Sequence, residues 1–258
     1  MFLLSIIIPT KNRSDFLRDN LASLSDDFLL KNGIELIVVD DGSVEDQRYN
    51  NKLACNQLES CTYYFQDLGG APKARNFGFF QSSGEYIWFL DDDDFVSENT
   101  MRQVIEYLEK KPSEQHFIVL PCRKIFDNNK YVEIYPQGDN NNFETYRTKG
   151  HQVNTSCTIF SRKVINNLNG WDEILKTGQD TDLFLRASKI SNVICLKTEP
   201  IIVYVAHSDR IGKKVFKQQY GKLQFLYKHW KTLSMRRRLY YIFTFIFWVP
   251  LLKKIMIK

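Results

Sequence analysis

The chain has 258 residues, 43% of them hydrophobic, so it can bury a substantial core as one large domain or as a domain with an extension. Its net charge of +5 could suggest nucleic acid or anionic lipid as a partner. The basic excess lies after position 210, however, and no acidic residue follows Asp209. Residues 1–210 carry 23 Lys and Arg against 30 Asp and Glu and are therefore acidic on balance, which argues against nucleic acid binding. Five scattered cysteines, without a CxxC pair or nearby histidine clusters, argue against structural zinc and disulfides and favour a cytoplasmic location.

Short apolar runs alternate with helical patterns, which is typical of βαβ units around a mainly parallel sheet. The predicted strands cover residues 3–8, 35–39, 62–65, 86–90 and 117–121. The predicted helices cover residues 15–25, 73–82 and 99–110, and two more begin near residues 45 and 180. The fold class that these elements predict is α/β, with a Rossmann-like, mainly parallel sheet flanked by helices.

Two segments qualify this pattern. The apolar N-terminal run 2–8 lacks a basic leader and a small-residue cleavage site, so it is predicted to be a first strand rather than a signal peptide. The polar, asparagine-rich stretch 127–150 is predicted to be an excursion over one face of the sheet, or a β-hairpin.

Four consecutive aspartates, Asp91–Asp94, directly follow the apolar run 86–90. A buried strand would therefore deliver carboxylates to its C-terminal end. Carboxylates this close raise one another's pKa unless a cation compensates. A hard divalent ion such as Mg²⁺ or Mn²⁺ is the expected compensator and brings phosphate oxygens with it. The alternative is a solvated acidic loop.

Two other predicted strands end in polar residues, PTKNR at 9–13 and DDGS at 40–43. In an open α/β sheet, ligands bind beyond the carboxyl ends of the strands. An aspartate there can accept from a ribose hydroxyl or a base N–H, although Asp-Gly after a strand is also ordinary turn chemistry. The chain has no GxxxxGK[ST] loop and no GxGxxG element, so nothing supports an NTPase or a dinucleotide-binding protein.

Four segments together resemble the family 2 glycosyltransferases of the GT-A fold, in the order and spacing of that family. They are SIIIPTKNR (5–13), IELIVVDDGS (34–43), GGAPKARNFGFFQSSGEYIWFLDDDD (69–94) and GWDEILKTGQDTDLFLR (170–186). The resemblance implies a nucleotide-diphosphate sugar donor, a divalent cation (Mn²⁺ or Mg²⁺) and, in most members, inversion at the anomeric carbon.

The resemblance also implies roles for individual residues. Those expected to line the donor nucleotide and its pyrophosphate are Pro9, Thr10, Asn12, Asp41, Lys73, Arg75 (or Asn76), Asp91 and Asp92. Asp93 would bind the metal, which neutralises charge on the departing nucleotide diphosphate. Some relatives place a metal-binding histidine in a C-terminal segment, here His207, which could equally be an exposed loop residue. Asp94 would orient the loop or cap the next helix.

A second acidic group lies in the stretch 178–182. In the resembled family this acid is the general base that takes the proton of the acceptor hydroxyl, which implies that role for Asp180. The structural alternative is that Asp180 caps a helix. Asp182 could share the chemical role, and Gln179 stands where family members often have Glu. Trp171 is expected to be an acceptor-site platform or part of the core.

The C-terminal tail carries a different kind of chemistry. An uncharged aromatic run, 239–252, is preceded by three arginines at 236–238 and followed by lysines at 253–254. The run is too short to span a bilayer comfortably, and Pro250 interrupts it. Aromatic residues with flanking cations suit a segment in the interface of an anionic bilayer. The alternative is a helix packed on the domain or on a second subunit.

These observations predict a catalytic domain over residues 1–210, with a nucleotide-binding half (1–95) and an acceptor-binding half (96–210), and a basic, aromatic helical tail (211–258). The function expected is inverting, metal-dependent transfer of a sugar to a glycan or lipid-linked glycan, at the cytoplasmic face of the cell membrane. The alternatives are a sugar-phosphate nucleotidyltransferase, which would want a Gly-rich basic loop after the first strand, and an inactive nucleotide- or glycan-binding module.

Overall fold

The computed structural model describes residues 2–67, 69–110, 115–126, 130–136, 153–205, 215–233 and 235–246. The chain divides into two compact units. The first comprises Met1–Trp171 and Leu183–His207, and the second comprises Asp172–Asp182 and Ser208–Lys258.

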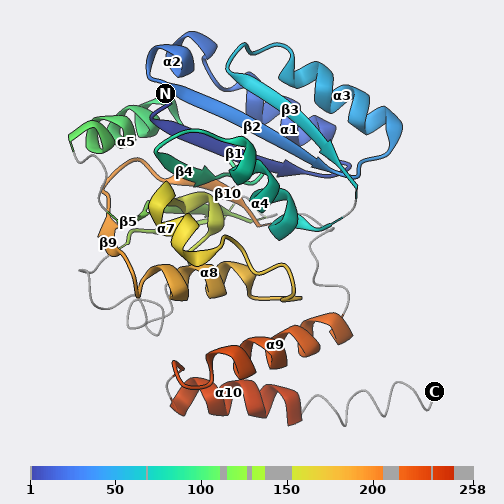
Figure 1. Cartoon of the computed structure of the whole chain (residues 1–258), viewed down its shortest axis with the longest axis vertical. Helices are drawn as coiled ribbons and strands as arrows, with labels where there is room; N and C mark the ends of the chain where they lie inside the picture. The colour runs from blue at the N-terminus through green and yellow to red at the C-terminus, as the bar shows by residue number, and fades with distance from the viewer. Residues whose placement is uncertain are drawn as a thin grey trace. The chain divides into compact units, whose positions relative to one another are not determined.

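The first unit is built on a seven-stranded sheet in the order β3-β2-β1-β4-β8-β5-β9 (Figure 1). Its strands are β1 (Leu4–Thr10), β2 (Ile34–Asp41), β3 (Cys61–Gln66), β4 (Tyr86–Phe89), β5 (His116–Val119), β8 (Thr158–Ser161) and β9 (Asn192–Cys195). β1 is parallel to β2 and β4, and β2 is parallel to β3. β8 is antiparallel to both of its neighbours, β4 and β5. The predicted mainly parallel α/β sheet is therefore confirmed, with one antiparallel strand that the sequence did not reveal.

A smaller sheet has the order β10-β6-β7. Its strands are β6 (Cys122–Ile125), β7 (Tyr131–Ile134) and β10 (Ile201–Tyr204), and β6 pairs antiparallel with β7. The strand β7 lies inside the polar stretch 127–150, for which a hairpin was one of two expectations. Most of the remainder of that stretch lies outside the described residues.

The helices of the first unit surround the large sheet. They are α1 (Ser14–Ala22), α2 (Asp26–Lys31), α3 (Glu45–Cys55), α4 (Ala71–Gln81), α5 (Glu98–Lys110), the short 3₁₀ helix η1 (Thr155–Cys157) and α7 (Arg162–Leu168), with most of α8 (Gln179–Ala187). The helix predicted over 15–25 corresponds to α1, which ends three residues earlier. The helix α2, which was not predicted, begins just beyond that range. Ser25 caps α2 by accepting a hydrogen bond from the Phe28 N–H.

The strands β1 and β2 are buried along their whole length, which explains their continuous apolar sequence. Successive side chains point to opposite faces of the sheet. On one face, Ile6 and Ile8 join a core cluster with Leu17 of α1. On the other, Ile7 and Val39 lie against Gly78 of α4. Helices on both faces thus fix the sheet edge that carries the polar strand ends.

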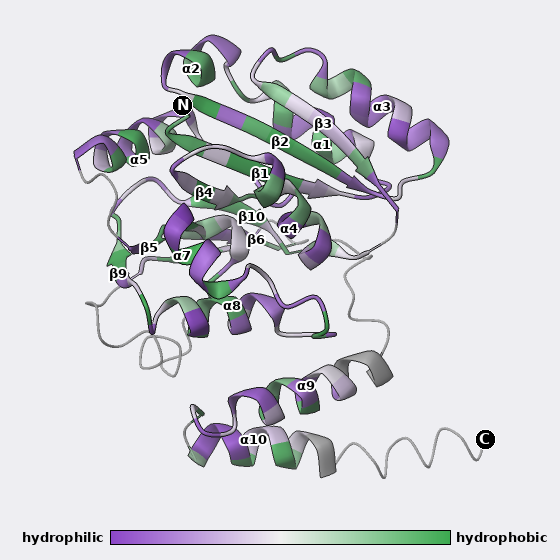
Figure 2. Ribbon diagram, in the orientation of Figure 1, coloured by the Kyte–Doolittle hydropathy of each residue, from purple (hydrophilic) through white to green (hydrophobic). Residues whose placement is uncertain are grey.

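The second unit contains the segment 172–182 and the helices α9 (Val215–His229) and α10 (Met235–Ile246). The rings of Phe225 and Tyr241 join the two helices, with centroids 5.7 Å apart. Both helices mix hydrophobic and hydrophilic residues, whereas β1 and β2 are largely hydrophobic (Figure 2). Among the described residues, no helix has the length and apolar character that crossing a bilayer requires.

The close approach of α4 to the sheet gives a stability prediction for Gly78→Ala. The added methyl group would lie 2.5 Å from Cγ2 of Ile7 and 3.2 Å from Cγ2 of Val39. Overpacking costs about 1–3 kcal/mol, and the better helix propensity of alanine returns only about 1 kcal/mol. We expect a net loss of roughly 1 kcal/mol or more in the free energy of unfolding, measured by denaturant titration. Phe80→Ala, at an exposed position of α4, is the control; a gain in stability for Gly78→Ala would contradict the prediction.

Candidate functional site

The four aspartates lie where β4 ends, beside the end of β1. Because these two strands are parallel, their carboxyl ends meet at one edge of the sheet. Oγ1 of Thr10 donates to Oδ2 of Asp92 at 2.7 Å, and Nη1 of Arg13 lies 3.0 Å from both Oδ1 of Asp92 and Oδ2 of Asp93. We call the group formed by Asp91–Asp94, Thr10, Arg13 and Arg75 the carboxylate edge.

A second arginine, Arg75, pairs with Asp91, the first of the four aspartates. Nη2 of Arg75, on α4, donates to Oδ1 of Asp91 at 2.5 Å. The same guanidinium lies over the indole of Trp171, 4.5 Å from the ring centroid. The Arg75 Nε is buried and has no hydrogen-bond partner within the described part of the chain. The sequence predicted a ligand role for Arg75 but none for Arg13, which is the last residue of the polar strand-end segment 9–13.

Burial raises the pKa of Asp92 to about 6, and repulsion from Asp93 adds to this shift. The Arg13 guanidinium and the Thr10 hydroxyl act in the opposite direction. The carboxylate is 4% exposed, so its charge depends on these partners rather than on water. A cation at this edge would favour the ionised form further.

Asp94 is set apart from the other three aspartates. Its Oδ2 accepts from Oγ of Ser156 at 2.5 Å, and its backbone carbonyl accepts from the Asn20 amide at 2.5 Å. The same Ser156 Oγ accepts the backbone N–H of Asp91. Burial first, and then repulsion from Asp91 and Asp93, raises the pKa of Asp94 well above its ordinary value. These contacts fit the expectation that Asp94 orients the loop.

The residues of the carboxylate edge fit a divalent cation of the kind that the sequence suggested. Mg²⁺ commonly binds proteins through one or two carboxylates and completes its shell with substrate phosphates and water. Within the described ranges, no group of three or more His, Cys, Asp or Glu residues could hold a metal ion alone. A cation at Asp93 would therefore need oxygen ligands from a phosphate. His207, the other predicted metal ligand, lies outside the described residues.

The ends of β1 and β2 are tied together at the predicted nucleotide pocket. Asn12, next after Pro9-Thr10-Lys11 and with φ of +52°, accepts from the Val44 N–H and donates its own N–H to Oγ of Ser43, both at 2.8 Å. Asp41 accepts from the N–H groups of Gly69 and Gly70 and from the Gln66 amide, each at 2.8 Å.

These contacts show what the predicted pocket residues do within the chain. Asp41 stabilises the glycine turn that precedes α4. Its carboxylate therefore has a structural role in addition to the predicted contact with a nucleotide base. Lys73, in the first turn of α4, is exposed. Pro9 and Thr10 are buried at the end of β1.

Trp171 is part of the core rather than an exposed platform. It is 3% exposed and packs edge-on against Phe89, with ring centroids 5.3 Å apart. The Asn76 side chain holds its backbone from both sides: Oδ1 accepts the Trp171 N–H at 2.8 Å, and Nδ2 donates to the Trp171 carbonyl at 3.0 Å. Of the two expectations for Trp171, the structure supports the core position, from which the indole supports Arg75.

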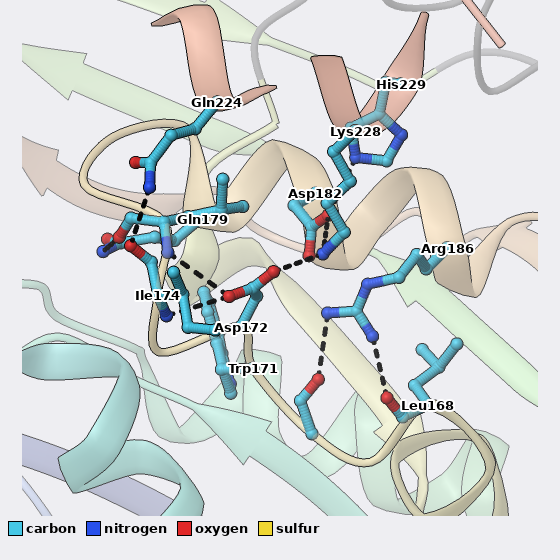
Figure 3. Close-up of polar contacts among 12 residues, drawn as sticks. Leu168, Trp171, Asp172, Ile174, Gln179, Asp182, Arg186, Gln224, Lys228 and His229 are labelled. Carbon is cyan, nitrogen blue, oxygen red and sulfur yellow. Dashed lines mark hydrogen bonds and ion pairs between the residues drawn. The ribbon is translucent and has the colours of Figure 1, made fainter. Parts of the chain in front are cut away.

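The second acidic group begins α8, in the second unit (Figure 3). Asp180 is the second residue of this helix, inside its first turn rather than at the flanking cap position, and its Oδ1 accepts the Thr181 N–H at 2.6 Å. Asp182 is fully buried, and its Oδ1 lies 2.7 Å from Nζ of Lys228 and 2.8 Å from Nε2 of His229. No sequence pattern indicated these two partners, which lie more than forty positions away.

The chain is similar in sequence to a known family and to curated proteins. The model of the glycosyl transferase family 2 matches residues 5–168. The chain is 27% identical over 191 residues to the minor teichoic acid biosynthesis protein GgaB of Bacillus subtilis (strain 168), covering 69% of this chain and 20% of GgaB. It is 31% identical over 121 residues to the poly(ribitol-phosphate) β-N-acetylglucosaminyltransferase TarS of Staphylococcus aureus (strain Mu50), covering 44% of this chain and 20% of TarS. The chain thus spans about a fifth of the length of these relatives.

Solved structures with a similar fold include S. aureus TarS 1–349 in complex with UDP-GlcNAc. The TM-score is 0.64 at 15% identity, covering 95% of this chain and 72% of the other. The mannosyltransferase PcManGT of Pyrobaculum calidifontis, in complex with GDP-Man and Mn²⁺, gives a TM-score of 0.62 at 13% identity, covering 90% and 65%. These neighbours have the GT-A fold. The family model covers more than half of the residues, and the chain therefore belongs to glycosyl transferase family 2.

Proposed function

We propose that the chain transfers a sugar from a nucleotide-diphosphate sugar, in the simplest case a UDP-sugar, to a hydroxyl of a glycan or lipid-linked oligosaccharide. The transfer would invert the anomeric carbon and form part of surface polysaccharide biosynthesis. The observation that carries this proposal is the carboxylate edge, where Asp92 and Asp93 are held together by one guanidinium at the joined ends of β1 and β4. The names of GgaB and TarS, and the UDP-GlcNAc bound to TarS, support the substrate class.

In this proposal Asp93 holds a Mn²⁺ or Mg²⁺ ion together with the donor diphosphate. The metal would supply charge neutralisation for the departing nucleotide diphosphate. Arg75, whose guanidinium is fixed by Asp91 and Trp171, would add a fixed positive charge near the pyrophosphate. Thr10 and Arg13 would keep Asp92 in place for the ribose. The Mn²⁺ in the PcManGT complex supports the choice of metal.

Asp180 is proposed as the general base. Inversion requires the acceptor hydroxyl to attack from the face opposite the leaving group, so the base and the metal belong on different sides of the sugar. One oxygen of Asp180 is anchored by the Thr181 N–H, which leaves the other to take the acceptor proton. Asp182 is unsuited to this role because its carboxylate is fully buried between Lys228 and His229.

The tail is proposed to hold the protein on the inner face of the cell membrane. Four apolar residues of α10 are exposed, and their successive spacings of four, one and three positions place them on one side of the helix: Met235, Leu239, Tyr240 and Phe243. The adjoining arginines 236–238 supply positive charge on the same helix. Exposed apolar and aromatic residues beside basic ones are the features of a helix that lies in an anionic bilayer interface. Residues 247–258, part of the predicted membrane segment, lie outside the described residues.

The first test is a donor screen. With Mn²⁺ present, we expect release of free nucleotide diphosphate from at least one of a panel of UDP- and GDP-sugars, and loss of this release in excess chelator. Asp93→Ala should lower transfer by roughly 10²-fold or more, the scale of losing one electrostatic group aimed at the leaving group. Asp15→Ala, on the exposed face of α1, is the control. Full transfer in chelator would reject the metal, and release of inorganic pyrophosphate from a nucleoside triphosphate would indicate a nucleotidyltransferase.

The second test concerns the base. Asp180→Asn keeps the size and the hydrogen bond to Thr181 but removes the basicity. We expect donor binding, measured by calorimetry, to stay within twofold while transfer falls by roughly 10²-fold or more. A purely structural Asp180 predicts near-normal transfer by this variant, since asparagine accepts the same N–H.

The third test concerns the membrane. Replacing Arg236 and Arg237 with glutamine should weaken binding to vesicles containing anionic phosphatidylglycerol by about 2 kcal/mol, because each basic residue near such a surface contributes about 1 kcal/mol. The matched control removes the same charge from α5 through Arg102→Gln and Lys110→Gln, both exposed. Equal sedimentation of both double variants with the vesicles would show that the tail does not dock there.

A further inference from the structure

One face of α9 is occupied by contacts with the segment 172–182 (Figure 3). The residues concerned are Gly221, Gln224, Phe225, Lys228 and His229. Their spacing of three, four, seven and eight positions places them on one side of an α-helix. The segment belongs to the same compact unit as α9 and carries Asp180 near its end.

At the middle of the helix, the Gln224 side chain binds the backbone of the segment in two places. Its Oε1 accepts the Lys176 N–H at 3.2 Å, and its Nε2 donates to the Ile174 carbonyl at 3.4 Å. One turn earlier, a Cβ on Gly221 would lie 2.6 Å from the backbone nitrogen of Thr177 and 2.3 Å from its hydroxyl. The two backbones therefore approach as closely as they do only because residue 221 has no side chain.

Toward its C-terminus, α9 holds both ends of the segment with charged groups. Nζ of Lys228 lies 2.5 Å from Oδ2 of Asp172 and 2.7 Å from Oδ1 of Asp182, so one ammonium bridges the first and last residues of the segment. His229 adds a hydrogen bond to the same oxygen of Asp182 at 2.8 Å. Asp182 is fully buried, and a buried carboxylate is strongly destabilised when its partners are removed.

Asp172 is fixed from its other side as well. Its Oδ1 accepts the backbone N–H groups of Ile174 and Leu175, at 2.9 and 3.3 Å. Burial acts to raise the pKa of Asp172, but the hydrogen bond from Lys228 and that from Ile174 outweigh it and lower the pKa below its ordinary value. The ionised form of Asp172 is thus the one that the segment and α9 stabilise together.

We propose that α9 is a positioning element for Asp180, with Lys228 and His229 as positioning residues that fix the first turn of α8 through Asp182. This inference rests on the proposed role of Asp180 as the base. The backbone that carries Asp180 is tied two residues later by a buried ion pair and hydrogen bond, and four residues earlier by Gln224. The helix holds this carboxylate ready for the acceptor hydroxyl and takes no part in donor binding.

The test measures three quantities for each variant: the transfer kcat, the acceptor KM, and the donor Kd by calorimetry. For Lys228→Met and His229→Leu we expect kcat to fall tenfold or more with the donor Kd within twofold. His229→Gln retains an N–H donor for Asp182 and should recover most of the transfer lost in His229→Leu. Tyr227→Ala, on the exposed side of α9, is the control and should behave as the unchanged chain.

If the charge variants fold poorly, Gly221→Ala tests the same inference without removing a charged group. Alanine favours the helix and leaves Lys228 and His229 unchanged, but its methyl group displaces the segment at Thr177. The crowding also costs stability, as at Gly78, so kcat is measured well below the thermal midpoint of the variant, where we expect it to fall. Normal transfer by Gly221→Ala, or by both Lys228→Met and His229→Leu, would overturn the inference. Normal transfer by Asp180→Asn would instead show that the base is wrongly assigned, which separates that failure from this one.

Discussion

Four consecutive carboxylates at the end of a buried strand can persist only if nearby cations and hydrogen-bond donors offset their mutual repulsion. The chain divides this task among three segments that are distant in sequence. Arg75 comes from α4 to Asp91, Arg13 comes from the end of β1 to Asp92 and Asp93, and Ser156 meets Asp94. Arg13 lies there because β1 is parallel to β4, whereas Ser156 lies just before the antiparallel strand β8.

The same need for charge compensation explains why the residues around the carboxylate edge are held in place by several contacts. A guanidinium offsets a carboxylate only while its own position is fixed, and Arg75 is fixed by the indole of Trp171. The backbone of Trp171 is in turn held by Asn76, the neighbour of Arg75 on α4. The ion pair between Arg75 and Asp91 therefore depends on α4 in two ways. This helix carries the arginine, and through Asn76 it also positions the residue whose ring lies against the guanidinium.

Much of the fold could be predicted because β1, β2 and β4 are buried on both faces and so appear as unbroken apolar runs. The short β8 could not, since four residues with two polar side chains give no such pattern, and its direction depends on strands far away in the sequence. The helix α2 was missed because its six residues are too few to show a helical period.

Candidate site residues could be named from the sequence where family motifs carry them, but not their contacts across the fold. The sequence indicated Asp91–Asp94 and Asp180, but not the bridge from Lys228 and His229 to Asp182. It also assigned Asp41 to a ligand, while the structure gives that carboxylate three hydrogen bonds within the chain. Hydrogen-bond partners of this kind are set by tertiary packing, which periodicity does not report.

The antiparallel direction of β8 has a consequence for how this edge can vary between related proteins. A parallel neighbour would present its last residues beside Asp91, but β8 presents its first ones, which is why η1 and Ser156 lie there. The chain therefore enters the neighbourhood of the aspartates immediately before β8, whose pairing with β4 begins only later along the strand. Insertions or exchanges just ahead of Thr155 can therefore alter the surroundings of Asp91 and Asp94 while the register between β8 and β4 stays as it is.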